Sequence, residues 1–301
     1  MVLLGIVAYF FPSPFLAVAD FNKAFFALTM FGIGVVLETE DFRRIAQRPG
    51  VVAVGSMAQF TLMPLGAFAV SRILHLSPEL TVGLVLTGAA PGAMASNVMS
   101  YVAKADTAYS VSLTAVSTLL CPLLTPMLVV LLAGREDTQF QMKFWPMTLD
   151  LLMVVILPLA AGFGVRHLFD RYVRKMLAVF PAISVTFIIF ICSLVIARNR
   201  DRLGEVTGVV LAAGVILNIY GMAAGYSVGS LFRLGLLRRR TLAIEIGMQN
   251  AGLGVVLAME HFGAESALPA AFFVFICIIT ASAAASYWQG NATSKSSLSK
   301  R

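Results

Sequence analysis

Charged residues are scarce in this chain of 301 residues, because Asp, Glu, Lys and Arg together make up only 12% of it. A soluble domain carries roughly a quarter charged residues. The shortage leaves too little charge to coat a globular surface in water, and 59% of the residues are hydrophobic. The composition therefore excludes an ordinary soluble protein. It predicts an integral membrane protein that has the lipid bilayer as its partner.

Cysteine and histidine are also scarce, with three residues of each. Cys121, Cys192 and Cys277 fall within apolar runs, which indicates packing residues rather than a disulfide framework or a metal cluster. The histidines lie in or beside separate connections, and the chain carries no HExxH, nucleophile elbow or phosphate-binding loop. We therefore predict that the protein is not an enzyme.

Long apolar runs make up most of the sequence. A backbone in lipid must satisfy its own hydrogen bonds, so such runs predict helices, and about 20 apolar residues cross the hydrocarbon core. The predicted fold is all-α. Charged or turn-rich breaks divide the chain into ten predicted transmembrane helices, at 2–19, 23–37, 50–74, 79–103, 107–133, 145–166, 177–197, 207–232, 239–260 and 266–288.

Basic residues are divided unevenly between the two sets of connections that ten spans create. One set, which includes the polar tail 289–301, holds roughly twice as many Lys and Arg residues as the other. The positive-inside rule places this set, and therefore both termini, in the cytoplasm. Basic cytoplasmic loops also account for the net charge of +7, so no nucleic-acid partner is expected.

Two of the predicted spans are interrupted at mid-membrane depth. The fourth contains GAAPGAMASN at 88–97 and the ninth contains EIGMQNAGLG at 245–254. Glycines and polar side chains favour unwinding in both, and Pro91 removes a backbone donor from the first. We expect two five-helix repeats, at 1–133 and 145–288, joined by a connection at 134–144. Each interrupted span is then the fourth span of its repeat. Because five is odd, the repeats are inverted, and two crossing broken helices indicate the binding site of a secondary transporter.

Glu245 is predicted near the centre of the ninth span, where a carboxylate costs about 2.5 to 3.5 kcal/mol on insertion scales. No Lys, Arg or His is predicted deep enough to pair with it. A bound cation would offset the cost, and a protonated or structurally paired glutamate stays an alternative. Neutral oxygens around a single carboxylate suit a monovalent ion such as sodium. In the two breaks and the neighbouring spans they come from Gln249, Asn250, Ser96, Asn97, Thr114 and Gln59.

At these residues the chain resembles the bile acid:sodium symporter family, including its bacterial members. This resemblance implies ten helices, of which the first, second, sixth and seventh form a panel domain and the other six a core domain. It also implies a bacterial inner membrane as the location. The matching stretches are FGIGVVLETEDFRR at 31–44, QFTLMP at 59–64, GAAPGAMASNVMSYVAKAD at 88–106, SLTAVSTLLCPLLTP at 112–126 and TLAIEIGMQNAGLG at 241–254.

The same resemblance implies two sodium sites beside the crossing of the broken helices, and Glu245 serves both. Relatives often have a serine where this chain has Ala115, so the first site is expected to bind sodium more weakly. The remaining ligands would be Ser96, Asn97 and Thr114 in the first site, and Gln59, Met248, Gln249 and the backbone carbonyl of Ile246 in the second.

Three residues are implied in substrate binding by the resemblance. Asn250 is expected to face the cavity between the two domains. Met94 and Cys277 stand where bacterial relatives often have a threonine and a histidine, so fewer polar contacts to the substrate are expected. Half-helix N-termini at the crossing favour a carboxylate or sulfonate.

The predicted function is therefore sodium-coupled symport of an organic anion by alternating access. Substrates of the family include bile acids, pantothenate-like acids and other carboxylates. A proton-coupled carrier in which Glu245 titrates is an alternative, and a channel is a further one. Uptake that requires sodium at constant pH separates the first two, whereas ion flux that no organic solute saturates indicates a channel.

Overall fold

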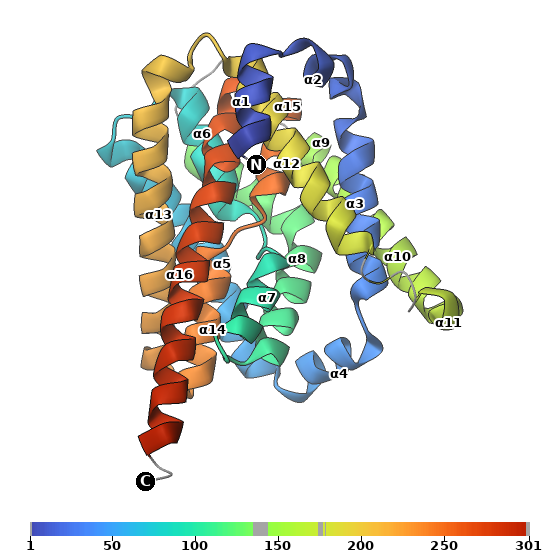
Figure 1. Ribbon diagram of the computed structural model, residues 1–301, viewed down its shortest axis with the longest axis vertical. Coiled ribbons are helices and arrows are strands. Elements are labelled where there is room, and N and C mark those ends of the chain that lie inside the picture. Colours follow the sequence, from blue (N-terminus) through green and yellow to red (C-terminus); the bar gives the residue numbers. More distant parts are fainter. Residues whose placement is uncertain (1, 135–143, 174–176, 178, 299–301) are drawn as a thin grey trace.

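The computed structural model describes residues 2–134, 144–173, 177 and 179–298 (Figure 1). The predicted connection at 134–144 and the last residues of the predicted tail, 299–301, therefore lie almost wholly outside the described residues. Every regular element in the described ranges is a helix. The α-helices are α1 (Val2–Phe10), α2 (Ser13–Ala17), α3 (Asn22–Val36), α4 (Thr39–Gln47), α5 (Pro49–Ile73), α6 (Pro78–Ala89), α7 (Ala95–Val102), α8 (Thr107–Ala133), α9 (Phe144–Leu151), α10 (Leu157–Leu168), α11 (Asp170–Val173), α12 (Val179–Asn199), α13 (Leu203–Leu231), α14 (Leu236–Gly247), α15 (Ala251–His261) and α16 (Leu268–Leu298).

Several helical stretches in the described residues are long and apolar enough to cross a membrane, which confirms an all-helical membrane protein. α9 and α10 form one of these stretches through a π-helical turn, Leu152–Ile156. The seven stretches are Ala19–Val36, Pro49–Ile73, Thr107–Ala133, Phe144–Leu168, Ala182–Asn199, Leu203–Leu231 and Glu265–Gly290.

The other three predicted spans each correspond to a pair of shorter helices: α1 and α2, α6 and α7, and α14 and α15. The first pair differs from the expected single helix over 2–19. The chain there reads Pro12-Ser13-Pro14, and α2 begins anew with Pro14 in its first turn. Proline lacks a backbone N–H and clashes with the preceding turn, so it divides a helix but is accepted at a helix start.

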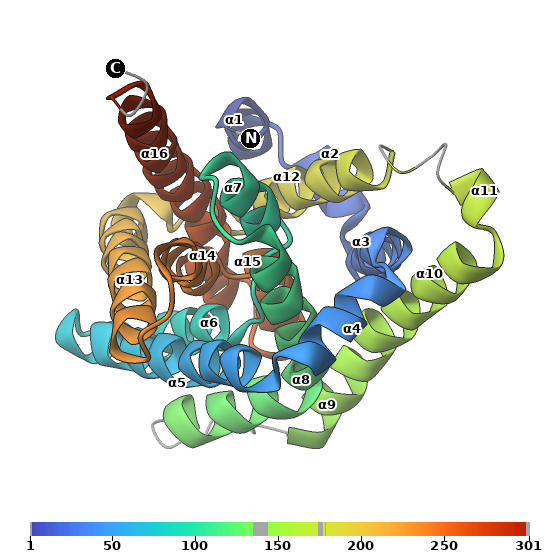
Figure 2. The same ribbon diagram turned by 90° about the horizontal axis from the view of Figure 1, so that it is seen from below.

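The helices pack as two sets that meet through α8, α15 and α16 (Figure 2). In one set α3 packs along α10 and against α12, and α12 also packs against α1. In the other set α5 packs on α6 and α8, and α13 packs on α14 and α16. The short helices α7, α14 and α15 lie between these longer helices, near the middle of Figure 2. Most residues at the two breaks are buried, with Ala90 and Met248 only 1% exposed, whereas α7 keeps one exposed face.

Glycine allows two of these helix pairs to approach closely. A Cβ atom added at Gly34 of α3 would lie 2.0 Å from the carbonyl oxygen of Leu159 in α10. Likewise, a Cβ atom at Gly225 of α13 would lie 2.5 Å from the carbonyl oxygen of Leu242 in α14. Backbone atoms cannot move aside as a flexible side chain can, so a larger residue would separate the helices. The second contact fixes the position of α14, which carries Glu245.

Candidate functional site

Both predicted helix breaks are present. Residues 90–94 separate α6 from α7, and residues 248–250 separate α14 from α15. In Figure 1 α6 and α15 lie in the upper half of the molecule and α7 and α14 in the lower half, so the two breaks meet near mid-height. Proline and glycine in the first break and a Gln-Asn pair in the second are poor residues for continuing a helix.

The two breaks pair with each other through their backbones. The N–H of Ala93 donates to the carbonyl of Met248 at 3.0 Å, and the N–H of Asn250 donates to the carbonyl of Pro91 at 2.8 Å. An antiparallel bridge joins the residues between these contacts. Because the membrane interior offers no water, each break supplies the hydrogen bonds that the other would lack.

Side chains from three neighbouring helices bind the carbonyl groups that the broken helices leave free. The last four carbonyls of a helix have no partner within the helix, and in a buried setting each needs a donor. α5, α8 and α13 supply these donors, so the long helices hold the breaks in place. The contacts are Gln59 Nε2 to Ala90 O (3.2 Å), Thr125 Oγ1 to Ala89 O (2.6 Å) and Asn218 Nδ2 to Gly247 O (2.8 Å).

The Glu245 carboxylate lies at this crossing and is only 2% exposed. Its Oε2 accepts hydrogen bonds from Ser96 (2.6 Å) and Ser110 (2.8 Å), and its Oε1 accepts one from Thr114 (2.5 Å). All three donors are neutral hydroxyls, and no basic side chain in the described part of the chain forms an ion pair with Glu245. A buried carboxylate without a counter-charge is costly, so this position favours a bound cation.

Near the Thr114 hydroxyl, the hydrogen-bond acceptors outnumber the protons that can be donated to them. The hydroxyl oxygen of Thr114 lies 2.5 Å from Glu245 Oε1, 3.1 Å from the carbonyl of Ser110 and 3.3 Å from Asn97 Oδ1. A hydroxyl carries a single proton and can satisfy one of these three acceptors at a time. Such a surplus of hard oxygen ligands is the coordination that alkali and alkaline-earth cations use.

The residues predicted for a second ion site also gather, although no hydrogen bond among the described residues joins their side chains to the Glu245 carboxylate. Gln59 Nε2 donates to Gln249 Oε1 at 2.5 Å, and Gln249 Nε2 donates to the carbonyl of Ile246 at 2.7 Å. Gln59 Oε1 is buried without a hydrogen-bond partner among the described residues. The carbonyl of Met248 accepts the backbone bond from the other break. The unpartnered amide oxygen is the atom in this group that is available to a cation.

Met94, one of the three predicted substrate residues, lines a narrow crevice between α7 and α8 on one side and α3 and α10 on the other. Asn97, Thr114 and Ala115 line the same crevice, so it runs beside the oxygen cluster. Its volume is about 10 Å³, which is close to the space for one water molecule. An organic anion does not fit there unless the two helix pairs separate.

Asn250 and Cys277 are placed elsewhere. The side chain of Asn250 caps α15 by accepting a hydrogen bond from the N–H of Leu253 at 3.2 Å. Cys277 is 3% exposed within α16 and packs in the apolar core, with its thiol 3.4 Å from the carbonyl of Val274. Neither residue lines the crevice beside Met94.

Ser110, Ser117 and Gly92 belong to the site but were missed in the sequence. Ser110 lies one turn before Thr114 on the same face of α8, and this four-residue spacing was a usable signal. Ser117 accepts a hydrogen bond from the N–H of Gly92 at 3.1 Å. A Cβ atom at Gly92 would lie 2.2 Å from Glu245 Oε1, so only glycine lets the carboxylate occupy this position. No local sequence pattern predicts the contact of Gly92 with Ser117 or its close approach to Glu245.

Comparison with known proteins gives a consistent result. A sodium-dependent transporter of Bacillus subtilis is 36% identical over 301 residues, which cover 100% of this chain and 92% of the relative. A probable chloroplastic sodium/metabolite cotransporter of Arabidopsis thaliana is 35% identical over 266 residues, 88% of this chain and 66% of the relative. A similar cotransporter of Oryza sativa is 32% identical over 261 residues, 86% of this chain and 62% of the relative, so the matches span less than two thirds of these plant proteins. The sodium bile acid symporter family matches residues 24–206, and the chain belongs to this family of transporters, which are not enzymes.

Proposed function

We propose that the protein is a sodium-coupled secondary active symporter of an organic anion that works by alternating access. The observation that carries this proposal is Glu245, a buried carboxylate whose partners are all neutral oxygen-bearing groups. The relatives from Bacillus and from plants are named for sodium, which supports sodium as the cation. The inward sodium gradient and the membrane potential, about 2.3 kcal/mol per charge per 100 mV, would supply the energy.

Two sodium sites are proposed at the crossing, both using Glu245. The first comprises Ser96, Asn97 and Thr114, and we add Ser110 because its hydroxyl lies 2.8 Å from Glu245 Oε2. The second comprises Gln59, Met248, Gln249 and the carbonyl of Ile246. For the second site, an ion would replace the hydrogen bond between the two glutamines and use the free Oε1 of Gln59.

The proposed architecture has ten spans in two inverted five-helix repeats, 1–133 and 145–288, with 134–144 between them. We assign α1 to α3, α9, α10 and α12 to the panel domain and the remaining spans to the core domain, which follows the packing of α3 against α10 and α12. Alternating access would be a movement of one set past the other. Both termini are placed in the cytoplasm of a bacterial cell.

The substrate is proposed to bind where the two domains meet. The crevice beside Met94 is bordered by α3 and α10 of the panel and by α7 and α8 of the core, so a relative movement of the domains would widen it. Sodium binding would order the adjacent helix breaks first. A carboxylate suits the half-helix N-termini there, with Asn250 and Cys277 as further contacts after the movement. Two sodium ions per monoanion would make transport electrogenic.

Thermal unfolding of the purified protein tests the ion dependence without knowledge of the substrate. At constant pH and ionic strength, sodium chloride should raise the melting temperature, and potassium or choline chloride should not, because a ligand stabilises the state that binds it. A carboxylate library should then add to the effect of sodium, followed by uptake into proteoliposomes. A melting temperature that depends on pH but not on sodium, together with uptake in potassium without sodium, would favour the proton-coupled carrier. This result would contradict our proposal.

A further inference from the structure

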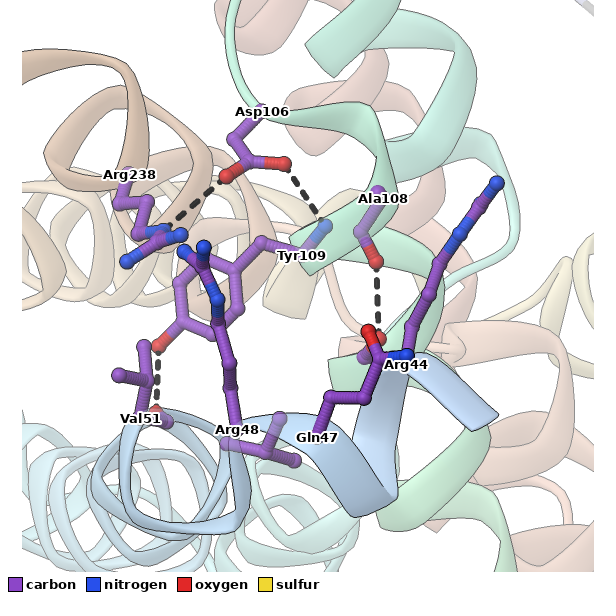
Figure 3. A pocket seen from close by; sticks show the side chains of 10 residues that line it. Arg44, Gln47, Arg48, Val51, Asp106, Ala108, Tyr109 and Arg238 are labelled. Carbon is purple, nitrogen blue, oxygen red and sulfur yellow. Dashed lines mark hydrogen bonds and ion pairs between the residues drawn. The ribbon is translucent and has the colours of Figure 1, made fainter. Parts of the chain in front are cut away.

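A second polar cavity, with none of the Glu245 cluster in its lining, lies where α4 passes the beginning of α5 and α8 (Figure 3). Its volume is about 280 Å³. Three arginines line it, Arg44 from α4, Arg48 between α4 and α5, and Arg238 from α14, together with a single carboxylate, Asp106. The pocket therefore carries an excess of positive charge. None of these residues belongs to the proposed ion or substrate sites.

The carboxylate of Asp106 is already engaged by the fold. Its Oδ1 accepts the N–H of Tyr109 at 3.0 Å and so caps α8, and its Oδ2 accepts Arg238 Nε at 3.0 Å. Arg44 forms an ion pair with Asp41 of the same helix, with 3.6 Å between Nη1 and Oδ1. Asp41 does not line the pocket. Arg48 has no ion-pair partner among the residues that the structure describes. Arg48 is therefore the arginine of this pocket that is left without a counter-charge in the described part of the chain.

Figure 3 shows Arg48 and Arg238 reaching the same pocket from different segments of the chain, and Tyr109 also lines this pocket. Two like charges repel, and an anion bound between them would turn this repulsion into two attractions. The ring is held in place, because the Tyr109 hydroxyl donates to the carbonyl of Val51 at 2.9 Å. Tyr109 therefore forms a fixed part of the pocket lining.

Three helices, α5, α8 and α14, also begin at this pocket. Residues from the first turns of α5, α8 and α14 line it, and two of these helices, α5 and α14, have no side-chain N-cap. The first turn of a helix has backbone N–H groups without helical partners and carries the positive end of the helix dipole. These donors add to the arginines in favouring a negative ligand.

We propose that this pocket binds a phosphate-bearing anion, held mainly by Arg48 and Arg238. Guanidinium groups bind phosphate oxygens in pairs, and a volume of about 280 Å³ admits a phosphate group with little more attached. The pocket lies where three predicted spans begin, so the phosphate could belong to a phospholipid headgroup or to a soluble ion. The bound anion would join α4 to α8 and α14.

The two sources are distinguished by thermal unfolding of delipidated protein in potassium buffers, which avoid any effect of sodium. One arm titrates potassium phosphate against potassium chloride at equal ionic strength. The other titrates short-chain phosphatidylglycerol against phosphatidylcholine. Saturable stabilisation by phosphate assigns a soluble anion, and stabilisation by phosphatidylglycerol alone assigns a headgroup. No selective stabilisation in either arm overturns the proposal.

Arg48→Gln is the decisive variant, because Arg48 has no partner in the described part of the chain and its loss should not disturb folding. We expect the phosphate-bearing ligand to bind at least 10-fold more weakly to this variant. Arg43→Gln is the matched control, because Arg43 is exposed on α4, lies 3.7 Å from Glu40 and does not line the pocket. If both variants bind the ligand like the unaltered protein, or lose binding equally, surface charge rather than the pocket is responsible and the proposal fails.

Discussion

The carboxylates in two regions of this protein are stabilised in opposite ways, one by basic side chains and the other by neutral hydroxyls. In the first, which we call the ionic cluster, Lys23 Nζ lies 3.1 Å from Asp150 Oδ2 and 2.7 Å from Glu260 Oε1. His261 Nε2 lies 3.0 Å from Asp150 Oδ2. These side chains come from α3, α9 and α15 and are partly exposed, so each carboxylate has a basic partner as well as solvent.

Glu245 has neither, although it is far more deeply buried. Its partners are hydroxyls that cannot carry charge. A protein that needs a carboxylate only for stability can pair it, as the ionic cluster does. The difference supports our proposal that the missing positive charge at Glu245 is supplied by a mobile cation. The following predictions test this contrast, from the largest expected effect on cation binding to none.

Glu245→Gln should have the largest effect on cation binding, because it removes the buried charge that has no basic partner among the described residues. We expect half-maximal stabilisation by sodium to require at least about 100-fold more sodium, since a buried charge that loses its partner costs about 3 to 5 kcal/mol. Sodium titration of the melting temperature measures this. Glu205→Gln is the control, because Glu205 is exposed in the first turn of α13. An unchanged sodium response in the Glu245 variant would refute the assignment.

Gly92→Ala should displace the same carboxylate without removing it. The added Cβ would meet Glu245 Oε1, the flexible end of a side chain, so the ion site should suffer more than the fold. Sodium binding should weaken by more than 10-fold while the melting temperature in potassium changes little. Gly164→Ala, where a Cβ meets open space, should leave sodium binding intact. Equal behaviour of the two variants would show that Gly92 has no role at the site.

Ser110→Ala should remove one oxygen that contacts the carboxylate. A hydrogen bond to a charged group contributes about 1.5 to 3 kcal/mol, so sodium affinity should fall by roughly 10- to 100-fold. Ser112→Ala is a close control, because Ser112 is also buried on α8 but bonds only to the carbonyl of Ala108. If sodium affinity survives the Ser110 change, this hydroxyl serves packing and not the ion.

Ala115→Ser should strengthen the first site. Ala115 lines the crevice beside Asn97 and Thr114, so a hydroxyl there would add one ligand oxygen. A neutral contact contributes about 0.5 to 1.5 kcal/mol, which corresponds to a roughly two- to tenfold lower sodium concentration at half-maximal stabilisation. Superimposable titrations of the two proteins would mean that the alanine leaves no ligand position empty.

Lys23→Met should leave sodium binding unchanged, because the ionic cluster supplies its own counter-charges. Partly exposed ion pairs contribute about 0.2 to 1 kcal/mol each, so the variant should unfold at a slightly lower temperature. The titration with sodium should keep its midpoint. A shifted midpoint would show that the two groups are coupled and that their contrast is not a simple division of roles.

The positions of the helix breaks and the burial of Glu245 beside them could be predicted from the sequence. Pro91, the glycines and a carboxylate inside an apolar run are local features, and local features decide where a membrane helix is costly to continue. The division of the first span at Pro12 had the same kind of signal. In contrast, the placement of Asn250 as a helix cap and of Cys277 in the apolar core depends on which face of a helix meets its neighbours.

The sequence by itself determined that this protein is a bundle of membrane helices with two interruptions around one isolated carboxylate, because hydropathy and helix-breaking residues act within a few positions of the chain. Only the tertiary structure decided that Ser110 completes the ring of hydroxyls around Glu245, 135 positions away, and that the breaks share their backbone hydrogen bonds. It also decided that Arg48 and Arg238, 190 positions apart, line the same pocket. Such meetings depend on how helices cross, and crossing is set by the packing of whole helix faces, which no short stretch of sequence contains.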